Sequence, residues 1–205
     1  MLNKLSNDNY DELLDLLLHL DITKEEHLTK LIDIIFNKAI KESKFCEIYA
    51  SLSVKLSGCY IINSEEKKVY FREILLNKCQ NIFETISSLN DENHMVESGF
   101  KFKEDVFGCM NFIGELYNHE LLTDKIMQSC LIMLLKQIAH NKFLVIYSLS
   151  TLFNTVAKVF CKKSPSAANL IYTKLELLTK SKEIKIKEKF AIKDVLERIK
   201  KDNLL

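Results

Sequence analysis

Apolar residues recur along this chain with the spacing of a helix. From residue 28 to residue 40, apolar side chains occupy every third or fourth position: Leu28, Leu31, Ile32, Ile35, Phe36, Ala39 and Ile40. Similar stripes run from Phe102 to Tyr117 and from Ile126 to Ile138. A half-buried strand alternates with a period of two and does not give this pattern. The chain is therefore expected to fold into amphipathic helices.

Local capping signals add helix boundaries to these stripes. Thr23 and Glu26 have the spacing of a capping box, and Thr123 precedes the stripe that starts at Ile126. Ser64, followed by two glutamates, indicates another helix start. The predicted helices span about 8–20, 23–42, 45–57, 65–88, 102–118, 123–138, 141–160, 166–180 and 184–201.

Composition supports an all-α fold without strands. The 205 residues include only 4 Gly and 1 Pro, too few for the many tight turns of a sandwich, barrel or doubly wound sheet. Hydrophobic residues make up 47% of the chain and charged residues 28%, as in an ordinary globular protein. We therefore expect one α-helical domain over residues 1–205, with one long polar connection at about 89–101 that forms a mobile loop.

Short connections make neighbouring helices antiparallel. Antiparallel pairs too thin to bury their own faces suggest an α-solenoid of about four to five helical hairpins. The expected pairs are 8–42, 45–88, 102–138 and 141–180, with 184–201 closing the end. A closed helical bundle fits the pattern alone equally well. The 141–160 helix is apolar almost all round, so we expect it in the interior.

Cysteine and histidine spacing gives no sign of a metal site or a cofactor. The six Cys residues lie at least 13 positions apart, and the five His residues form no closely spaced pair. Buried, reduced thiols acting as small apolar side chains are the simpler interpretation, and they indicate a reducing compartment. Acidic residues interrupt the N-terminal apolar stretch, which indicates neither a signal peptide nor a membrane span.

No catalytic constellation appears in the sequence. It contains no Gly-rich phosphate loop, nucleophile elbow or zinc-protease motif. Carboxylates such as Glu42 and Glu115 are isolated on predicted helices, where they usually serve as solvated surface or caps. We expect a protein that is not an enzyme.

Three segments, in order, resemble the middle domain of eukaryotic translation initiation factor 4 gamma. They are DIIFNKAIKESKFCEIY at 33–49, VYFREILLNKCQNIFE at 69–84 and FIGELYNHELLTDKIMQSCLIMLLK at 112–136. The resemblance covers residues 2–138 well and 139–201 more weakly. Two departures stand out: Ser43 replaces the family's usual Pro, and Glu104 and Asp105 follow the lysines where the family has a basic run.

The resemblance implies a HEAT-type stack of helical hairpins that serves translation initiation as a scaffold. Such a domain is expected to bind and stimulate the DEAD-box RNA helicase initiation factor 4A, to contact mRNA weakly, and to be monomeric and cytoplasmic. A related middle domain of nonsense-mediated decay, poly(A)-binding-protein interaction or splicing is one alternative. A general RNA-binding α-solenoid without a helicase partner is another.

The C-terminal part of the chain is strongly basic. Residues 162–201 hold twelve Lys and Arg against five Asp and Glu. A basic surface attracts RNA phosphates by releasing counterions, so we predict RNA contacts at Lys182, Lys185 and Lys187. The alternative is a solvated charged face without a ligand.

Phe190 falls outside the apolar stripe of the last predicted helix. That stripe runs through Ile192, Val195, Leu196 and Ile199, and at 100° per residue Phe190 points about 160° away from Ile192. An outward aromatic side chain among charges is typical of an interface anchor. The resemblance implies that this hairpin binds the helicase through Phe190, Ile186, Lys187, Lys193 and Asp194. The alternative is that a further helix covers Phe190 as core.

A second candidate binding surface is predicted at the edge formed by the turn after the 23–42 helix. Connections between stacked hairpins line one side of a solenoid, so Lys41, Glu42 and Lys44 are candidates for helicase binding. The alternative is a solvated turn. We expect the aromatic residues near this turn, Phe36, Phe45 and Tyr49, to lie in the core. Tyr147, in the most apolar predicted helix, is expected in the core as well.

Overall fold

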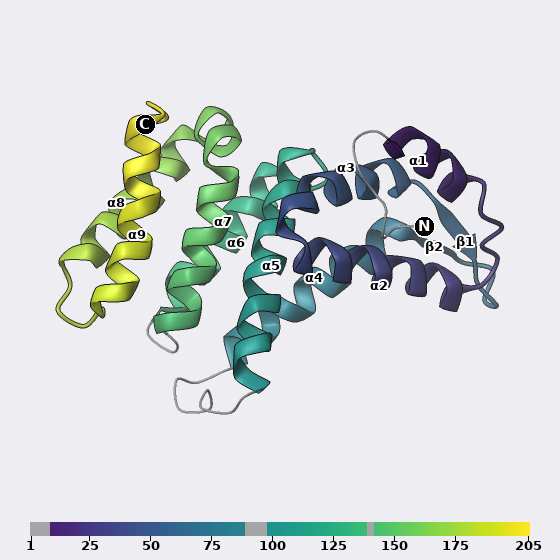
Figure 1. Ribbon diagram of the computed structural model, residues 1–205, viewed down its shortest axis with the longest axis horizontal. Coiled ribbons are helices and arrows are strands. Elements are labelled where there is room, and N and C mark those ends of the chain that lie inside the picture. Colours follow the sequence, from purple (N-terminus) through teal and green to yellow (C-terminus); the bar gives the residue numbers. More distant parts are fainter. Residues whose placement is uncertain (1–8, 89–97, 139–141) are drawn as a thin grey trace.

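The computed structural model describes residues 9–88, 98–138 and 142–205 (Figure 1). This part of the chain folds into nine α-helices, a 3-10 turn and one small hairpin. In order they are α1 (Tyr10–Leu18), α2 (Glu25–Lys41), η3 (Ser43–Phe45), α3 (Cys46–Leu56), β1 (Tyr60–Ile62), β2 (Lys68–Tyr70), α4 (Phe71–Ser88), α5 (Ser98–Asn118), α6 (Asp124–Gln137), α7 (Lys142–Lys163), α8 (Pro165–Lys180) and α9 (Ile186–Lys201).

The helices form an open, two-layered stack with α1 to α3 at one end and α9 at the other (Figure 1). Along one layer α3 packs on α5, α5 on α7 and α7 on α9, while α2, α4, α6 and α8 form the second layer. Because the two ends do not meet, the fold is a solenoid and the closed bundle is excluded. The all-α solenoid prediction is confirmed.

The hairpins are shifted by one helix from the predicted pairing. The observed pairs are α2 with α3, α4 with α5, α6 with α7, and α8 with α9, and α1 packs on α3. The expected pairs began with α1 and left α9 to close the stack. Loop length does not determine where one hairpin ends and the next begins, because α4 pairs with α5 although residues 89–97 separate them in the sequence.

The core follows α5 and α7, which contact each other along their lengths. Twelve residues of α7 are buried, as its all-round apolar sequence predicted. By length and composition α7 would also suffice to cross a membrane, but here it lies among α5, α6, α8 and α9 as a core helix.

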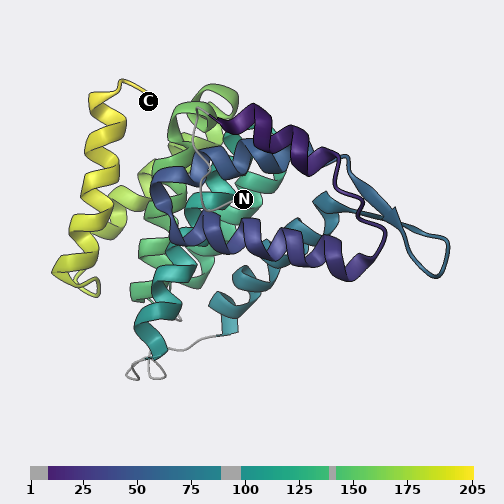
Figure 2. The same ribbon diagram turned by 45° about the vertical axis from the view of Figure 1, so that its right-hand side comes forward.

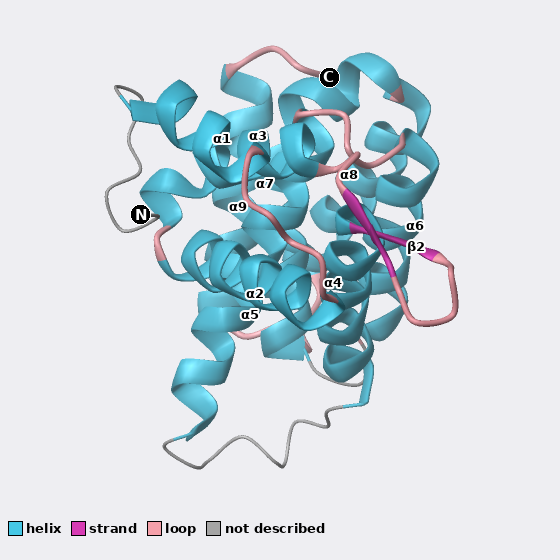
Figure 3. Ribbon diagram, turned by 90° about the vertical axis from the view of Figure 1, so that its right-hand side faces the viewer, coloured by secondary structure: helices cyan, strands magenta, loops and turns pink. Residues whose placement is uncertain are grey.

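Residues 60–70 form an antiparallel hairpin where the sequence analysis expected no strand and a helix from 65. Tyr60 pairs with Tyr70, and the hairpin projects beyond the helices (Figures 2 and 3). The Asn63 side-chain oxygen accepts hydrogen bonds from the backbone N–H groups of Glu65 and Lys67, both at 3.0 Å. This Asx-type turn displaces the predicted helix start, and α4 begins at Phe71.

Of the other predicted helix boundaries, some agree with the structure and some do not. The Thr123 cap is confirmed, because its hydroxyl oxygen accepts a hydrogen bond from Ile126 N–H at 3.4 Å. The Thr23 capping box is wrong, because Lys24 occupies the cap position of α2 without a side-chain bond. Of the expected loop at 89–101, the last four residues belong to α5, and residues 89–97 lie outside the described residues.

One glycine permits a close crossing of α2 and α5. A Cβ atom on Gly108 of α5 would lie 2.0 Å from the backbone oxygen of Ile40 in α2. No side chain fits at that distance, so α2 and α5 approach this closely only because residue 108 lacks one.

Candidate partner-binding surfaces

Helix α9 has an inner face that the fold requires. Ile192, Val195, Leu196 and Ile199 are buried, as the apolar stripe predicted. Glu188 is buried as well, with 2% of its surface exposed. Its Oε2 atom accepts a hydrogen bond of 2.6 Å from the backbone N–H of Lys185, so this carboxylate caps the start of the helix.

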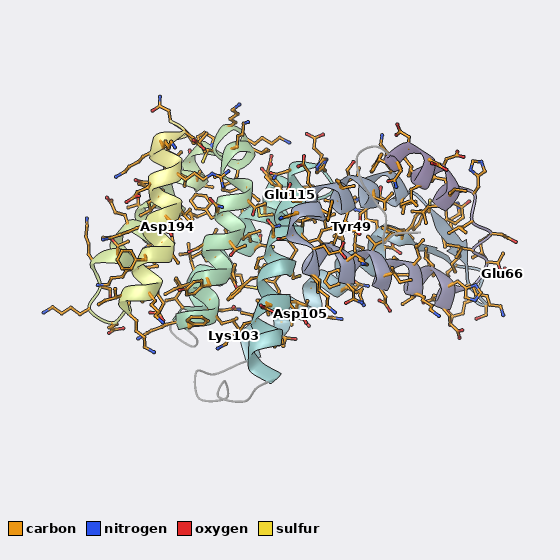
Figure 4. All side chains as sticks on the ribbon, in the orientation of Figure 1. Tyr49, Glu66, Lys103, Asp105, Glu115 and Asp194 are labelled. Atoms are coloured by element: carbon orange, nitrogen blue, oxygen red, sulfur yellow. The ribbon has the colours of Figure 1, made fainter. Side chains whose placement is uncertain are left out.

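The outer face of α9 exposes two large apolar side chains. Phe190 is 59% exposed and Ile186 is 72% exposed. The Lys193 ammonium lies 5.9 Å from the centre of the Phe190 ring, and Asp194 is exposed beside it (Figure 4). The structure thus brings the five predicted α9 residues to one surface, which we call the α9 surface: Ile186, Lys187, Phe190, Lys193 and Asp194.

The three predicted RNA-contacting lysines are exposed at the beginning of the same helix. Lys185 and Lys187 flank the first residue of α9, and Lys182 lies in the turn before it. The positive end of the helix dipole points toward this turn, which adds to the lysine charges. Glu183 reduces the local charge only in part, because its carboxylate pairs with Lys142 at 3.3 Å.

The second predicted edge does not form one continuous surface. Lys41 lines a cleft of about 750 Å³ together with Glu104 and Asp105 of α5. Lys44 lines a different cleft of about 380 Å³, which α1, α3 and His119 border. Lys41 is the last residue of α2, whereas Lys44 lies within the 3-10 turn η3, and the two side chains have different surroundings.

Glu42, the middle residue of that edge, is engaged by the fold. Its carboxylate pairs with Lys38 at 2.5 Å and accepts a hydrogen bond from the Tyr49 hydroxyl at 3.2 Å. Burial, and then the charge of Glu42, raise the pKa of Tyr49 far above its usual value. Glu42 is therefore half-buried and holds α3 against the end of α2.

The aromatic predictions near this edge are partly confirmed. Phe36 and Tyr49 are buried, whereas Phe45 is 39% exposed because η3 interrupts the helical stripe just before α3. Tyr147 was expected in the core but is half-buried. Its ring lies 4.6 Å from that of Phe143, and its hydroxyl donates to the Lys187 carbonyl at 3.4 Å.

A carboxylate and a histidine meet between α3 and α5. Burial raises the pKa of Glu115, and the charge of Glu47 raises it further. Glu115 accepts a hydrogen bond from the Asn118 side-chain amide at 3.2 Å, and His119 lies 4.0 Å from Glu47. Glu115 and Asn118 both lie in α5, whereas the His119–Glu47 contact joins the end of α5 to α3.

The thiols have the properties of core residues. Burial raises the pKa of Cys46 to about 12 and that of Cys130 to about 11. All six cysteines are unpaired, and among the described residues no group of three suitable side chains could hold a metal ion. A thiol with so high a pKa is a poor nucleophile at neutral pH.

Comparison with known proteins identifies the family. The model of the MIF4G domain matches residues 1–202. The chain belongs to the MIF4G family. The match extends through the C-terminal helices, where the sequence resemblance had been weaker. MIF4G domains of translation initiation factor 4G are non-catalytic, so this chain is a non-catalytic domain.

Its relatives are much longer proteins. The chain is 30% identical over 222 residues to eukaryotic translation initiation factor 4 gamma 1 of Mus musculus, covering 96% of this chain and 14% of that protein. It is 27% identical over 215 residues to eukaryotic translation initiation factor 4G of Cucumis melo, covering 96% of this chain and 11% of the relative. The MIF4G domain described here thus spans only about one eighth of such proteins.

A solved structure supports the fold. The MIF4G domain of Trypanosoma cruzi translation initiation factor EIF4G5 superposes with a TM-score of 0.59 at 21% sequence identity. The match covers 98% of this chain and 92% of that structure. The shared HEAT-type arrangement accounts for both helical layers of the stack.

Proposed function

We propose that this MIF4G domain is a scaffold of translation initiation that binds the DEAD-box RNA helicase initiation factor 4A. Membership of the family and relatives that are translation initiation factors support the role. The observation that carries the residue assignment is the exposed Phe190 on a helix whose inner face is fully packed. Homologues of this kind also support a cytoplasmic location.

A rigid solenoid would stimulate the helicase without chemistry of its own. The two lobes of a DEAD-box helicase must close together to complete the site for ATP and RNA. A scaffold that binds both lobes holds them near their closed orientation and lowers the entropic cost of closure. In this proposal the α9 surface binds one lobe, and the residues around Lys41 and Lys44 bind the other.

Within the α9 surface, Phe190 is the anchor. A large apolar side chain that becomes buried in a partner's pocket supplies most of an interface's free energy, and surrounding charges contribute orientation. Lys193 and Asp194 flank the ring with opposite charges, so they select a partner surface with the complementary arrangement. Ile186, one helical turn earlier, enlarges the apolar contact.

Phe190→Ala tests the proposal. Truncation of an aromatic anchor typically costs about 2 kcal/mol or more of binding free energy, roughly thirtyfold in affinity. Because the Phe190 ring is largely solvent-exposed, the thermal midpoint of the variant should stay close to that of the wild type. Helicase affinity and stimulation of its ATPase should both fall. Calorimetric titration and a thermal melt on the same preparation measure the two quantities.

Leu177→Ala is the matched control. Leu177 lies on α8 and is 54% exposed, nearly as much as Phe190, but it lies outside the α9 surface. It should leave both affinity and melting unchanged. A large drop in the melting temperature of Phe190→Ala would show that the ring is core, and an unchanged affinity would remove the α9 surface from the helicase interface.

A second candidate function is weak RNA binding at Lys182, Lys185 and Lys187. The exposure of all three lysines at the N-terminal end of α9 favours it. Such binding would be electrostatic and nearly independent of sequence. A middle-domain scaffold of nonsense-mediated decay, poly(A)-binding-protein interaction or splicing, or a general RNA-binding solenoid, remains the alternative if the helicase does not bind.

A further inference from the structure

The layer formed by α2, α4, α6 and α8 contains an apolar groove between α4 and α6. The groove has a volume of about 300 Å³. Gln80 is the one lining residue with a polar amide side chain. The other lining residues are apolar or carry sulfur: Leu76, Cys79, Phe83, Ile113, Leu122, Ile126, Cys130 and Met133. Ile126 and Met133 remain 40% and 43% exposed, so part of this apolar surface faces solvent. Figure 3 shows α4 and α6 on the same side of the molecule.

Both walls of the groove have helical spacing. On α6 the lining residues Ile126, Cys130 and Met133 are four and three positions apart. On α4, Leu76 and Phe83 are seven positions apart. Each wall is therefore a straight row of side chains about two helical turns long. A groove between two such rows accepts a third helix by the packing of ridges into grooves.

The walls favour a helix over an extended peptide. An extended strand needs partners for its own backbone N–H and C=O groups when it leaves water. The backbone groups of α4 and α6 are already bonded within those helices, so they offer no such partners. A helix satisfies its own backbone and presents only side chains to an apolar groove.

Exposed charged residues on the rims beside the two walls differ in sign, except at the N-terminal end of α4, where the Arg72 guanidinium donates to the Leu121 carbonyl at 3.0 Å. On α4, Glu73 and Glu84 are eleven residues apart, and on α6 Lys125 and Lys136 have the same separation. Eleven residues correspond to about three turns, so each pair lies along one line of its helix. All four side chains are exposed, and among the described residues no ion pair joins the two rims.

We propose that the α4–α6 groove binds a short amphipathic helix of a partner protein. The helix would carry an apolar stripe of Leu-like residues, with basic residues along one flank and acidic residues along the other. Its basic flank would lie against Glu73 and Glu84, and its acidic flank against Lys125 and Lys136. The site lies apart from the α9 surface, and it does not depend on helicase binding.

Three synthetic helical peptides of roughly 18 residues, about five turns, test this proposal. All have the same apolar stripe. The mixed peptide has Lys on one flank and Glu on the other, the basic peptide has Lys on both, and the acidic peptide has Glu on both. The mixed peptide should bind roughly tenfold more tightly than either of the others at low salt, and the preference should shrink at high salt. Fluorescence anisotropy measures the affinities.

Two variants of the full chain locate the site. Met133→Glu places a charge inside the groove and should weaken the mixed peptide at least tenfold, whereas Leu177→Glu on α8 should not. The double variant K125E/K136E makes both rims acidic and should transfer the preference to the basic peptide. All of these side chains are exposed, so the melting temperatures of the variants should stay near the wild-type value. The double variant tests the proposal even if Met133→Glu unfolds.

Several outcomes would overturn the proposal. One is equal affinity for all three peptides, because charge on the rims would then not select the occupant. A second is binding that survives Met133→Glu. A third is concentration-dependent dimerisation in sedimentation that Met133→Glu abolishes, because a second copy of the chain would then occupy the groove. A fourth is binding of phosphatidylcholine vesicles without binding of any peptide, because the occupant of the groove would then be a lipid and not a partner helix.

Discussion

Replacement of Gly108 by alanine changes the stability of the fold in two opposite ways: it favours the helix and it creates a steric clash. Gly108 lies inside α5, where alanine favours the helix by about 1 kcal/mol over glycine. The new Cβ atom would lie 2.0 Å from the Ile40 backbone oxygen, whereas carbon and oxygen atoms normally stay about 3.3 Å or more apart. The obstacle is main chain, so it cannot rotate away as a side chain would. The backbones of α2 and α5 must therefore separate by more than about 1 Å.

The packing cost exceeds the gain in helix propensity. Overpacking a closely packed interior costs about 1–3 kcal/mol, and occasionally more. Because the clash involves two helix backbones, we expect a packing cost in the upper part of that range, about 2–3 kcal/mol. After the gain in helix propensity of about 1 kcal/mol, the net destabilisation is about 1–2 kcal/mol. In a domain of this size each kcal/mol lowers the melting temperature by about 2–4 °C. Gly108→Ala should therefore melt roughly 2–8 °C below the wild type.

Thermal melts followed by far-ultraviolet circular dichroism measure the effect. Gly58→Ala is the control, because a methyl group there would meet no atom within 4 Å beyond its chain neighbours, and the Gly58 backbone is not left-handed. It should change the melting temperature little or raise it slightly. A Gly108→Ala variant that melts at or above the wild-type temperature would refute the argument, because α2 and α5 would then not cross at this distance.

Three further predictions concern charge. At neutral pH, Glu115→Gln should raise the melting temperature, because burial raises the pKa of Glu115, and the gain should disappear below the ordinary value of 4.5. Glu120→Gln should lower the melting temperature at neutral pH, because Lys163 lowers the pKa of Glu120, and the loss should fade in acid as Glu120 becomes protonated. Filter binding of single-stranded RNA should weaken steeply between low and physiological salt, with a smaller salt slope after charge reversal at Lys182, Lys185 and Lys187. An unchanged slope would place any RNA contact elsewhere.

Local periodicity was sufficient to predict which faces of the helices are buried. The stripe of α9 predicted both the burial of Ile192 and the exposure of Phe190, because a helix that packs on one side fixes the direction of every side chain it carries. The Thr123 cap was predictable for a similar reason, since a cap depends on residues adjacent in sequence. Both predictions needed no knowledge of distant contacts.

Features that depend on distant contacts were not predictable in this way. The spacing of Ser64 and its two glutamates suits a helix start, but the hydrogen bonds of Asn63 and the pairing of Tyr60 with Tyr70 favour a hairpin. The contact of Glu42 with Tyr49 and the groove beside Met133 depend on how neighbouring helices are placed relative to one another. The pairing of the helices into hairpins has the same origin, because α4 pairs with α5 across the long connection at 89–97.

In the proposed function, helix α9 serves both the fold and a partner without conflict. Its buried stripe attaches it to α7 and α8, so the exposed Phe190 and Ile186 are positioned by a helix whose place is already fixed. Little ordering entropy then remains to be lost at the interface, which is the main advantage of a rigid scaffold. Lys193 and Asp194 beside the ring keep the apolar area small, which disfavours association of free copies. An anchor of this kind needs a partner with both a pocket for the ring and charges complementary to its neighbours, so selectivity comes from requiring the two together.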